Sequence, residues 1–212
     1  IFIPSACGGR GSCGLCKVTL ERGAGSPLAT ELAWLSPAEQ AGGVRLACQV
    51  KVKNDLALVL PEALLEVRQY ATRVVGLRDL TPDIKEVRLQ LVDPPAITFK
   101  AGQFIQFEVP PYDLTDEPVY RAYSIASPPS ASGAIELEIR AVPNGLCTTY
   151  VHRHLRVGDV VTINGPYGDF TLRDTDREIL CVAGGSGMAP IKSILTDMAE
   201  QRNPRKVRYF YG

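Results

Sequence analysis

The chain has 212 residues, of which 45% are hydrophobic, so it is long enough to bury one large core or two ordinary ones. Lys and Arg together number 23, as do Asp and Glu, so net charge does not attract the chain to nucleic acid or to a membrane surface. No apolar run approaches the roughly 20 residues of a membrane-spanning helix. The chain opens on Ile1 without an initiator Met and stops just after a strand-like segment, 207–211, so we expect a fragment of a longer protein.

Four of the six cysteines lie within the first fifty residues. Cys7, Cys13 and Cys16 follow a C-x5-C-x2-C spacing in a glycine-rich loop, and Cys48 comes after 31 further residues. Iron–sulfur clusters take four thiolates, several from one loop and the last from a distant turn. Glycines let such a loop curl closely and direct its N–H groups at the sulfurs. The spacing therefore favours an iron–sulfur site, although the first gap is one residue longer than in plant-type ferredoxins.

A zinc site and disulfide bonds are the alternatives for these cysteines. Zinc ribbons usually pair two C-x2-C knuckles, and only one is present here. Disulfide frameworks are typical of small, cysteine-dense secreted chains, which this chain is not. Of the other cysteines, Cys181 is expected to be a buried small hydrophobe, and Cys147 fits either a packing role or a place near a cofactor.

The cysteine-rich part predicts a small α+β unit over residues 1–66. Alternating side chains predict three strands, at 17–20, 44–50 and 56–60. Ser36 and Glu39 have the spacing of a capping box with Pro between them, and Gly42 is a stop signal for the short helix that follows. Trp34 is expected in the core. If this unit is a β-grasp ferredoxin domain, its first hairpin should precede residue 1.

From about Tyr70 the sequence changes to alternating strands broken by Pro and Gly, which predicts a small antiparallel barrel over 67–174. Apolar side chains alternate with polar ones in two clear runs, 104–109 and 135–140. A barrel of this kind has an inner and an outer face, and its rim can hold a flat ligand.

Two short motifs in the barrel are candidates for binding such a ligand. Arg121-Ala122-Tyr123-Ser124 offers a phosphate partner, a ring to stack on an isoalloxazine and a hydroxyl near flavin N5. The turn 144–149 opens a predicted short helix to Arg153, with small hydroxyl residues suited to a pyrophosphate. The first motif alone is compatible with an ordinary exposed strand, but together the two motifs favour a flavin.

Residues 175–212 predict the first strand–turn–helix–strand of a dinucleotide-binding fold. The run 178–183 is short and apolar, as in a buried parallel strand. The turn Gly184-Gly185-Ser186-Gly187 leads into a helix over 189–201, with Pro190 in its first turn, and 207–211 is the next strand. The turn lacks the G-x-G-x-x-G pattern, so a βα turn without a ligand is the alternative.

In this order, the cysteine motif, Arg121 to Ser124 and Gly184 to Pro190 resemble the ferredoxin–NAD(P)H reductase superfamily with an N-terminal 2Fe-2S ferredoxin domain. Within it the chain is most similar to the F subunits of sodium-translocating NADH:quinone oxidoreductases. The resemblance implies a multidomain fold: an α+β β-grasp ferredoxin domain with its N-terminal part missing (1–66), an antiparallel barrel for FAD (67–174) and the start of an α/β NAD(P)-binding domain (175–212).

The resemblance also implies a role for each motif. The 2Fe-2S cluster would be bound by Cys7, Cys13, Cys16 and Cys48. The residues implied for FAD are Arg121, Ala122, Tyr123, Ser124, Arg140, Gly145, Leu146, Cys147 and Thr148, with Tyr123 against the isoalloxazine and Ser124 near N5 as the catalytic pair. The residues implied for NADH or NADPH are Gly184, Gly185, Ser186, Gly187, Met188 and Pro190.

The function this implies is a flavin-dependent oxidoreductase that passes electrons from NAD(P)H through FAD to the cluster and on to an acceptor protein or a quinone-reducing membrane complex. The implied location is cytoplasmic, at the inner membrane through a segment outside this chain. Alternatives are the reductase component of a multicomponent oxygenase, a non-enzymatic iron–sulfur electron carrier and a zinc-stabilised interaction module. No nucleic-acid partner is expected.

Overall fold

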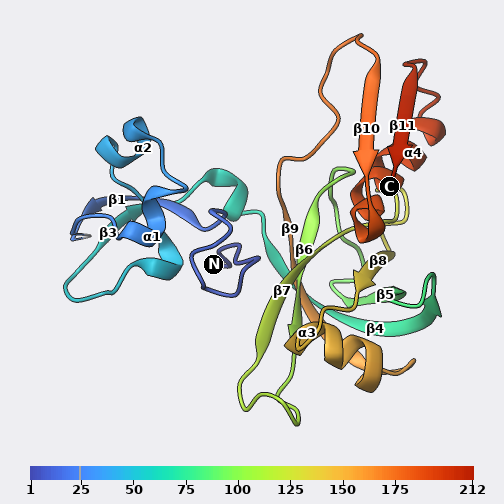
Figure 1. Cartoon of the computed structure of the whole chain (residues 1–212), viewed down its shortest axis with the longest axis horizontal. Helices are drawn as coiled ribbons and strands as arrows, with labels where there is room; N and C mark the ends of the chain where they lie inside the picture. The colour runs from blue at the N-terminus through green and yellow to red at the C-terminus, as the bar shows by residue number, and fades with distance from the viewer. Residues whose placement is uncertain (24) are drawn as a thin grey trace.

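The computed structural model describes residues 1–23 and 25–212. Within them the strands form three separate sheets, of three, six and two strands. Figure 1 shows the three-stranded sheet with its short helices at one end of the molecule, the six-stranded sheet beyond it, and the two-stranded sheet with α4 beside that larger sheet. The chain therefore combines α+β and β units in one elongated molecule.

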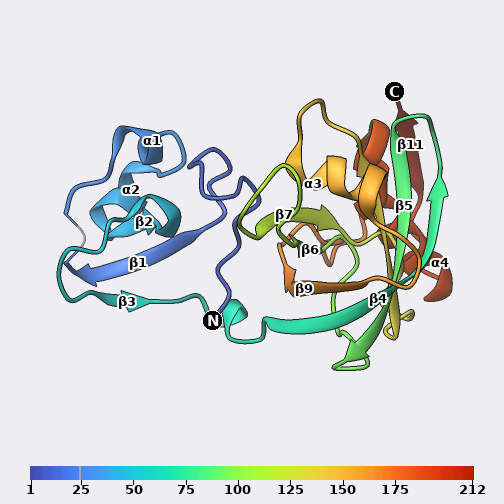
Figure 2. The ribbon, with the colours of Figure 1, turned by 90° about the horizontal axis from the view of Figure 1, so that it is seen from below.

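The N-terminal unit, residues 1–66, is built on a central strand, β1, with an antiparallel neighbour on each side. Figure 2 shows β1 and β3 running side by side, with α1, α2 and β2 gathered next to β1. Its elements are β1 (Lys17–Arg22), α1 (Ala29–Leu32), α2 (Pro37–Ala41), β2 (Val44–Leu46) and β3 (Ala57–Val59). Two 3-10 turns, Ala47–Gln49 and Glu62–Leu64, follow β2 and β3.

Helix α2 begins at the predicted capping box. The Ser36 hydroxyl accepts a hydrogen bond from the Glu39 N–H at 3.2 Å, and the Glu39 carboxylate accepts one from the Ser36 N–H at 2.7 Å. The same carboxylate pairs with Lys17 of β1 at 2.7 Å, so the cap also fixes the helix to the sheet. Gly42 ends the helix as expected.

A buried ion pair holds α1 to β2. Glu31, which is fully buried, accepts hydrogen bonds from Arg45 Nε at 2.8 Å and from Arg45 Nη2 at 2.6 Å. It also accepts the backbone N–H groups of Leu28 and Leu46, so every lone pair direction is used. A buried charge is tolerated only with such pairing.

The expectation that Trp34 lies in the core is wrong. Its side chain is 40% exposed, and its ring lies beside Gly14 of the cysteine loop, where a Cβ atom would meet it at 2.7 Å. The core of this unit is small, and its central cluster of buried residues is Cys16, Leu35 and Leu46. The large indole ring of Trp34 therefore covers the cysteine loop from outside instead of filling the core.

The six-stranded sheet has the order β7-β6-β9-β4-β5-β8, with every pair antiparallel. A single bridge between Ile125 and Leu137 joins the end of β7 to β8, which closes the sheet into the expected barrel. The strands are β4 (Arg68–Asp79), β5 (Ile84–Asp93), β6 (Phe104–Val109), β7 (Val119–Ser124), β8 (Ala134–Arg140) and β9 (Val160–Tyr167). Helix α3 (Leu146–Thr149) continues as a π-helical turn over Tyr150–His154, and its buried residues join the barrel core.

The predicted alternation holds on β6 and β8, with two informative exceptions. Ile105, Phe107, Ile135 and Leu137 are fully buried in the barrel core. The intervening polar residues belong to the outer face, yet Gln106 and Glu138 are buried as well. Each lies where a neighbouring part of the chain covers the barrel: the N-terminal segment over Gln106 and α4 over Glu138.

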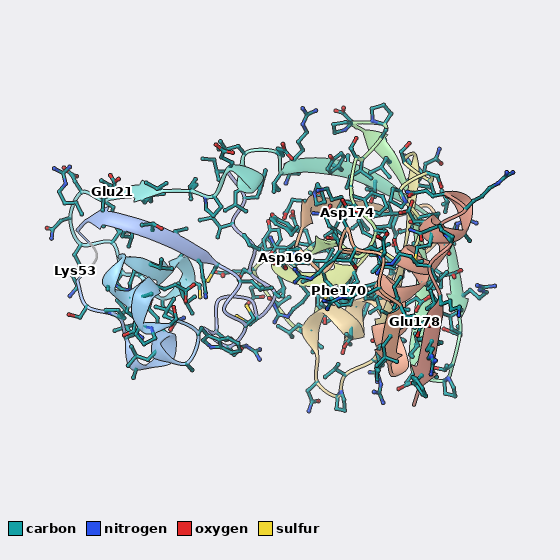
Figure 3. All side chains as sticks on the ribbon, turned by 90° about the horizontal axis from the view of Figure 1, so that it is seen from above. Glu21, Lys53, Asp169, Phe170, Asp174 and Glu178 are labelled. Atoms are coloured by element: carbon teal, nitrogen blue, oxygen red, sulfur yellow. The ribbon has the colours of Figure 1, made fainter. Side chains whose placement is uncertain are left out.

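The C-terminal unit consists of β10 (Ile179–Ala183), α4 (Met188–Glu200) and β11 (Val207–Tyr211), with β10 and β11 parallel as expected. The connection from β9 runs over the barrel, and Figure 3 shows Phe170 and Asp174 on it and Glu178 just before β10. The Phe170 carbonyl lies against Gly102, whose φ of +97° and lack of a side chain allow this close approach.

The expectation that β10 is a buried strand is wrong for this chain. Cys181 is buried, as expected, but Leu180 and Val182 are 65% and 71% exposed. A parallel strand is buried on both faces only where helices cover both sides of its sheet. Here α4 covers one side, through its buried Ile191, Ile194 and Met198.

Candidate functional site

The four N-terminal cysteines form two pairs. Cys16 and Cys48 approach each other with their sulfurs 3.3 Å apart, one from the end of the loop and the other from the 3-10 turn after β2. Cys7 and Cys13 interact through a hydrogen bond between their thiols. All six cysteines of the chain are free thiols in this structure.

The backbone of the cysteine loop turns inward toward the sulfurs. Burial alone would raise the pKa of the Cys7 thiol, but hydrogen bonds with the Ser12 and Arg10 backbone and with the Ser12 and Cys13 side chains lower it to about 6. Burial raises the pKa of Cys16 to about 12. Cys7 thus has the hydrogen-bond donors that stabilise a metal-bound thiolate.

A two-iron cluster fits this donor set. No group of three or more His, Cys, Asp or Glu side chains surrounds one metal-ion position within residues 1–23 and 25–212. Two cysteine pairs are present instead, and each iron of a 2Fe-2S cluster takes two thiolates.

Strand β7 carries Arg121 to Ser124 at an open edge of the barrel. It pairs with β6 along its whole length, whereas its other edge has only the bridge that follows at Ile125. Tyr123 packs edge-on against Phe107 of β6, with ring centres 6.2 Å apart, and its hydroxyl donates to the Cys147 sulfur at 3.1 Å. Burial raises the pKa of both Tyr123 and Cys147, so both are neutral at pH 7.

A pocket of about 540 Å³ collects most of the residues predicted to bind flavin. It is lined by Arg121, Ala122, Tyr123, Arg140, Gly145, Leu146, Cys147 and Thr148, and by Ser186 from the glycine turn. The predicted residues outside this lining are Ser124, Gly184, Gly185, Gly187, Met188 and Pro190. Residues as far apart in the sequence as Arg121 and Ser186 thus meet at one cavity, because the barrel brings the end of β8, the turn before α3 and the open edge of β7 together.

The turn before α3 is held by its own side chain. Thr148 Oγ1 accepts a hydrogen bond from the Val142 N–H at 3.1 Å and lies 3.3 Å from the Val142 carbonyl oxygen. A Cβ atom at Gly145 would meet this hydroxyl at 2.6 Å, so only glycine fits there. The Thr148 hydroxyl therefore shapes the turn, and a ligand would meet the turn through its backbone.

The glycine turn packs against the end of β8. Arg140 forms an ion pair with Asp83 at 2.7 Å, and its guanidinium also lies beside Gly185. Tyr211 of β11 donates to the Gly185 carbonyl oxygen at 3.3 Å, and Tyr209 donates to the Met188 sulfur at 2.7 Å. Of this turn and the residues that follow it, only Ser186 belongs to the pocket lining.

Two charged residues of the pocket were not predicted as site residues. Arg10 reaches the pocket from the cysteine loop, and Glu138 reaches it from β8. The place of Arg10 depends on how the N-terminal unit lies on the barrel, which a local pattern does not show. The sequence indicates only that Glu138 is a polar residue in a strand of alternating polar and apolar residues.

The cysteine loop lies directly on the strands that carry the flavin motif. The Ser5 N–H donates to Gln106 Oε1 at 2.6 Å, and Gln106 is held in turn by Asn164 and Tyr167. Gly8 lies so close to the Arg121 guanidinium that a side chain there would collide with it. The two predicted cofactor sites are thus in contact through these residues.

Two family models match the chain. The model of the 2Fe-2S iron–sulfur cluster binding domain matches residues 1–53, and that of the oxidoreductase FAD-binding domain matches residues 71–172. Both fall on the units that contain the cysteine pairs and the open edge of β7.

The curated relatives include subunits F of Na(+)-translocating NADH-quinone reductases. The one from Neisseria meningitidis is 37% identical over all of this chain and 61% of its own length, and the one from Idiomarina loihiensis is 38% identical over 60% of its length. This chain thus spans about three fifths of the curated relatives it matches.

Solved structures with the same fold cover the whole chain. The Amycolatopsis cytochrome P450 reductase GcoB matches with a TM-score of 0.74 and 30% identity, over 100% of this chain and 64% of its own. The ferredoxin reductase in carbazole 1,9a-dioxygenase matches with a TM-score of 0.70 and 31% identity, over 99% and 62%. These matches confirm the expected fold: the chain is similar over its whole length to ferredoxin reductases, and its first two units match a 2Fe-2S iron–sulfur cluster binding domain and an oxidoreductase FAD-binding domain.

Proposed function

We propose that this chain is part of a flavin-dependent oxidoreductase that takes electrons from NADH or NADPH and passes them through FAD and a 2Fe-2S cluster to an acceptor. The proposed acceptor is a quinone-reducing membrane complex, in line with the name of the relatives that are 37% identical. Residues 1–66, 67–174 and 175–212 are the proposed cluster, flavin and nucleotide units. Within the part that the structure describes, no helix has the length and hydrophobicity of a membrane span.

One observation carries the proposal. A single 540 Å³ pocket is lined by the cysteine loop, the open edge of β7, the turn before α3 and the glycine turn. An oxidoreductase of this kind needs its electron donor, flavin and cluster close together, and these four segments are the ones predicted to bind them. Bound FAD supplies the chemistry that accepts a pair of electrons and releases them one at a time.

The chain's own residues would position the cofactors. The Arg121 guanidinium donates a hydrogen bond to the carbonyl of its neighbour Tyr120, which carries no charge, so the charge of Arg121 is available to a flavin phosphate. Tyr123 is locked by Phe107 and Cys147 and would present a fixed, neutral ring. Ser124, at the end of β7, would hydrogen-bond near N5. The two cysteine pairs would each bind one iron.

The test is an anaerobic reduction of the full-length protein reconstituted with FAD, iron and sulfide. NADH is expected to bleach the flavin absorbance first and the cluster absorbance after it. Reduction of the flavin without reduction of the cluster, or failure to bind FAD at all, would contradict the proposal. Iron and zinc analysis of the same sample separates the cluster from a zinc module.

A second candidate is the reductase component of an oxygenase. It is favoured by the solved reductases of a cytochrome P450 and of carbazole 1,9a-dioxygenase, which cover 99–100% of the chain. Both candidates share the cofactors and differ in the acceptor. Binding of the full-length protein to inner-membrane vesicles favours the quinone reductase, and reduction of a soluble oxygenase component favours the alternative. A cytoplasmic location at the inner membrane is part of the first proposal.

A further inference from the structure

Arg10 lies in the middle of the cysteine loop, between Gly9 and Gly11, and lines the same pocket as Arg121 and Arg140. Arg10 therefore belongs by sequence to the cluster site and by position to the flavin site. We propose that Arg10 is a flavin-binding residue, which contacts an FAD phosphate from the iron–sulfur unit. This inference rests on the proposed function, because it requires the pocket to hold FAD.

The loop is fixed where it can make this contact. Ser5 binds Gln106 through its N–H at 2.6 Å, and its hydroxyl accepts the Gly9 N–H at 2.9 Å. Gly8 lies against the Arg121 guanidinium with no room for a side chain. These contacts hold the residues on the N-terminal side of Arg10 against the barrel, so Arg10 lies at the pocket without any movement of the two units.

Arg10 is exposed and, in the described part of the chain, has no carboxylate partner at the pocket. Within residues 1–23 and 25–212 its guanidinium has no ion pair and no side-chain hydrogen bond, and Arg121 donates only to the Tyr120 carbonyl. Arg140 is paired with Asp83.

Among the residues that the structure describes, Glu138 is the only carboxylate of the pocket lining. It is buried, and its Oε1 lies 3.6 Å from Nζ of Lys192 in α4. It is therefore already matched by a cation of its own. Two arginines without acidic partners at one cavity are an arrangement that binds a diphosphate, since each guanidinium can donate two hydrogen bonds to phosphate oxygens.

A consequence is that the cluster unit takes part in binding the flavin. Arg121 comes from the barrel and Arg10 from the iron–sulfur loop, so a phosphate between them would connect the two units. Flavin binding is then expected to strengthen the attachment of the loop that holds Cys7 and Cys13 to the barrel, in addition to filling the barrel's own site.

The experiment measures flavin affinity, independent of catalysis. The chain and its variants Arg10→Gln, Arg10→Lys and Arg22→Gln are titrated with FAD, FMN and riboflavin, and the loss of flavin fluorescence gives Kd. Arg22 is a matched control, because it is an exposed arginine of the same unit that lies at the end of β1, outside the pocket lining. Riboflavin, which lacks phosphate, and the iron content of each sample report on whether the fold is intact.

We expect Arg10→Gln to weaken FAD and FMN about tenfold, Arg10→Lys to weaken them less, and neither to change riboflavin affinity, since only the phosphate contact is lost. Equal FAD affinity in Arg10→Gln and the wild type would overturn the inference. An equal loss of FAD affinity in Arg22→Gln would also overturn it, because it would indicate a general effect of charge. An equal loss of riboflavin affinity in Arg10→Gln would do the same. A wild-type chain that binds no flavin would instead remove the proposed function itself.

Discussion

The hydroxyl group of Tyr123 donates a hydrogen bond to the thiol sulfur of Cys147, 3.1 Å away. The two residues belong to β7 and α3, so this bond joins the open edge of the barrel to the helix that fills its end. Sulfur is a weak acceptor, but the bond lies in a buried site where a lost partner is not replaced by water.

Tyr123→Phe removes this bond while the ring keeps its contact with Phe107. We expect the free energy of unfolding to fall by about 0.5–1.5 kcal/mol. Urea denaturation followed by circular dichroism measures it. A double-mutant cycle with Cys147→Ala separates the bond from the packing, and strictly additive effects would show that the bond contributes nothing.

Glu31→Gln is expected to lower the stability of the N-terminal unit by about 3–5 kcal/mol at neutral pH, because Arg45 loses its charged partner in a buried site. Trp34 is the only tryptophan of the chain and its backbone N–H donates to the Glu31 carbonyl oxygen, so its fluorescence follows the unfolding of this unit. Glu21→Gln is the control. Figure 3 shows Glu21 on the N-terminal unit, at a distance from the barrel.

The same pair sets a pH dependence. Burial would raise the pKa of Glu31, but hydrogen bonds from Arg45, Leu28 and Leu46 lower it below its usual value. A carboxyl group with a lowered folded-state pKa stabilises the fold above its unfolded pKa of roughly 4.3, and this stability is lost as the pH falls. The difference between wild type and Glu31→Gln should therefore shrink below about pH 4. A difference in the free energy of unfolding that stays constant from pH 7 to pH 3 would contradict this role of Glu31.

Lys192→Met is expected to loosen α4 from the barrel. Lys192 lies 3.0 Å from Glu136 and 3.6 Å from both Glu86 and Glu138, so its loss leaves three carboxylates together. Burial already raises the pKa of Glu138, and Lys192 opposes that rise.

In the variant the pKa of Glu138 should rise further, so the loss of stability should be larger at pH 8 than at pH 5. Hydrogen exchange of the α4 amides at the two pH values measures this. Lys206→Met, an exposed lysine of the same unit, should exchange like the wild type at both.

Gln106→Leu is expected to release the N-terminal segment from the barrel. It leaves the Ser5 N–H and the Asn164–Tyr167 pair without a partner, which should cost about 1–3 kcal/mol. The Ser5 amide should exchange faster, and electron transfer from flavin to cluster should slow while both cofactors stay bound. Gln90→Leu on the exposed face of β5 is the control, and an unchanged Ser5 amide would contradict the anchoring role.

Ser124→Ala tests the one predicted catalytic residue that lies outside the pocket lining. If its hydroxyl binds near flavin N5, flavin reduction by NADH should slow about tenfold while the cluster remains intact. Single-turnover stopped-flow absorbance measures the rate. Ser132→Ala, on the exposed loop before β8, is the control, and a normal rate in Ser124→Ala would exclude the role.

Local patterns in the sequence were sufficient to predict most elements. The capping box at Ser36, the alternation on β6 and β8 and the glycine turn before α4 each depend on neighbours in the chain, and each has the structure expected. Exposure was harder to predict. Trp34 and the strand β10 were expected to be buried, but burial depends on which other parts of the chain cover a residue.

The pocket shows the same limit. Arg121, Tyr123 and Thr148 could be named because they belong to short motifs, whereas Arg10 and Glu138 could not. Arg10 lies at the pocket because the N-terminal segment is held on the barrel by contacts such as that of Ser5 with Gln106, and no spacing in the sequence predicts such contacts.

The barrel is closed by little more than the bridge between Ile125 and Leu137, supported by a bond from the Ala126 N–H to the Glu136 carbonyl at 2.7 Å. This narrow seam begins directly after Ser124. A flat ligand along the open edge of β7 would lie across this seam and would hold β7 and β8 together. The stiffness of the barrel and the occupancy of its site would then rise and fall together.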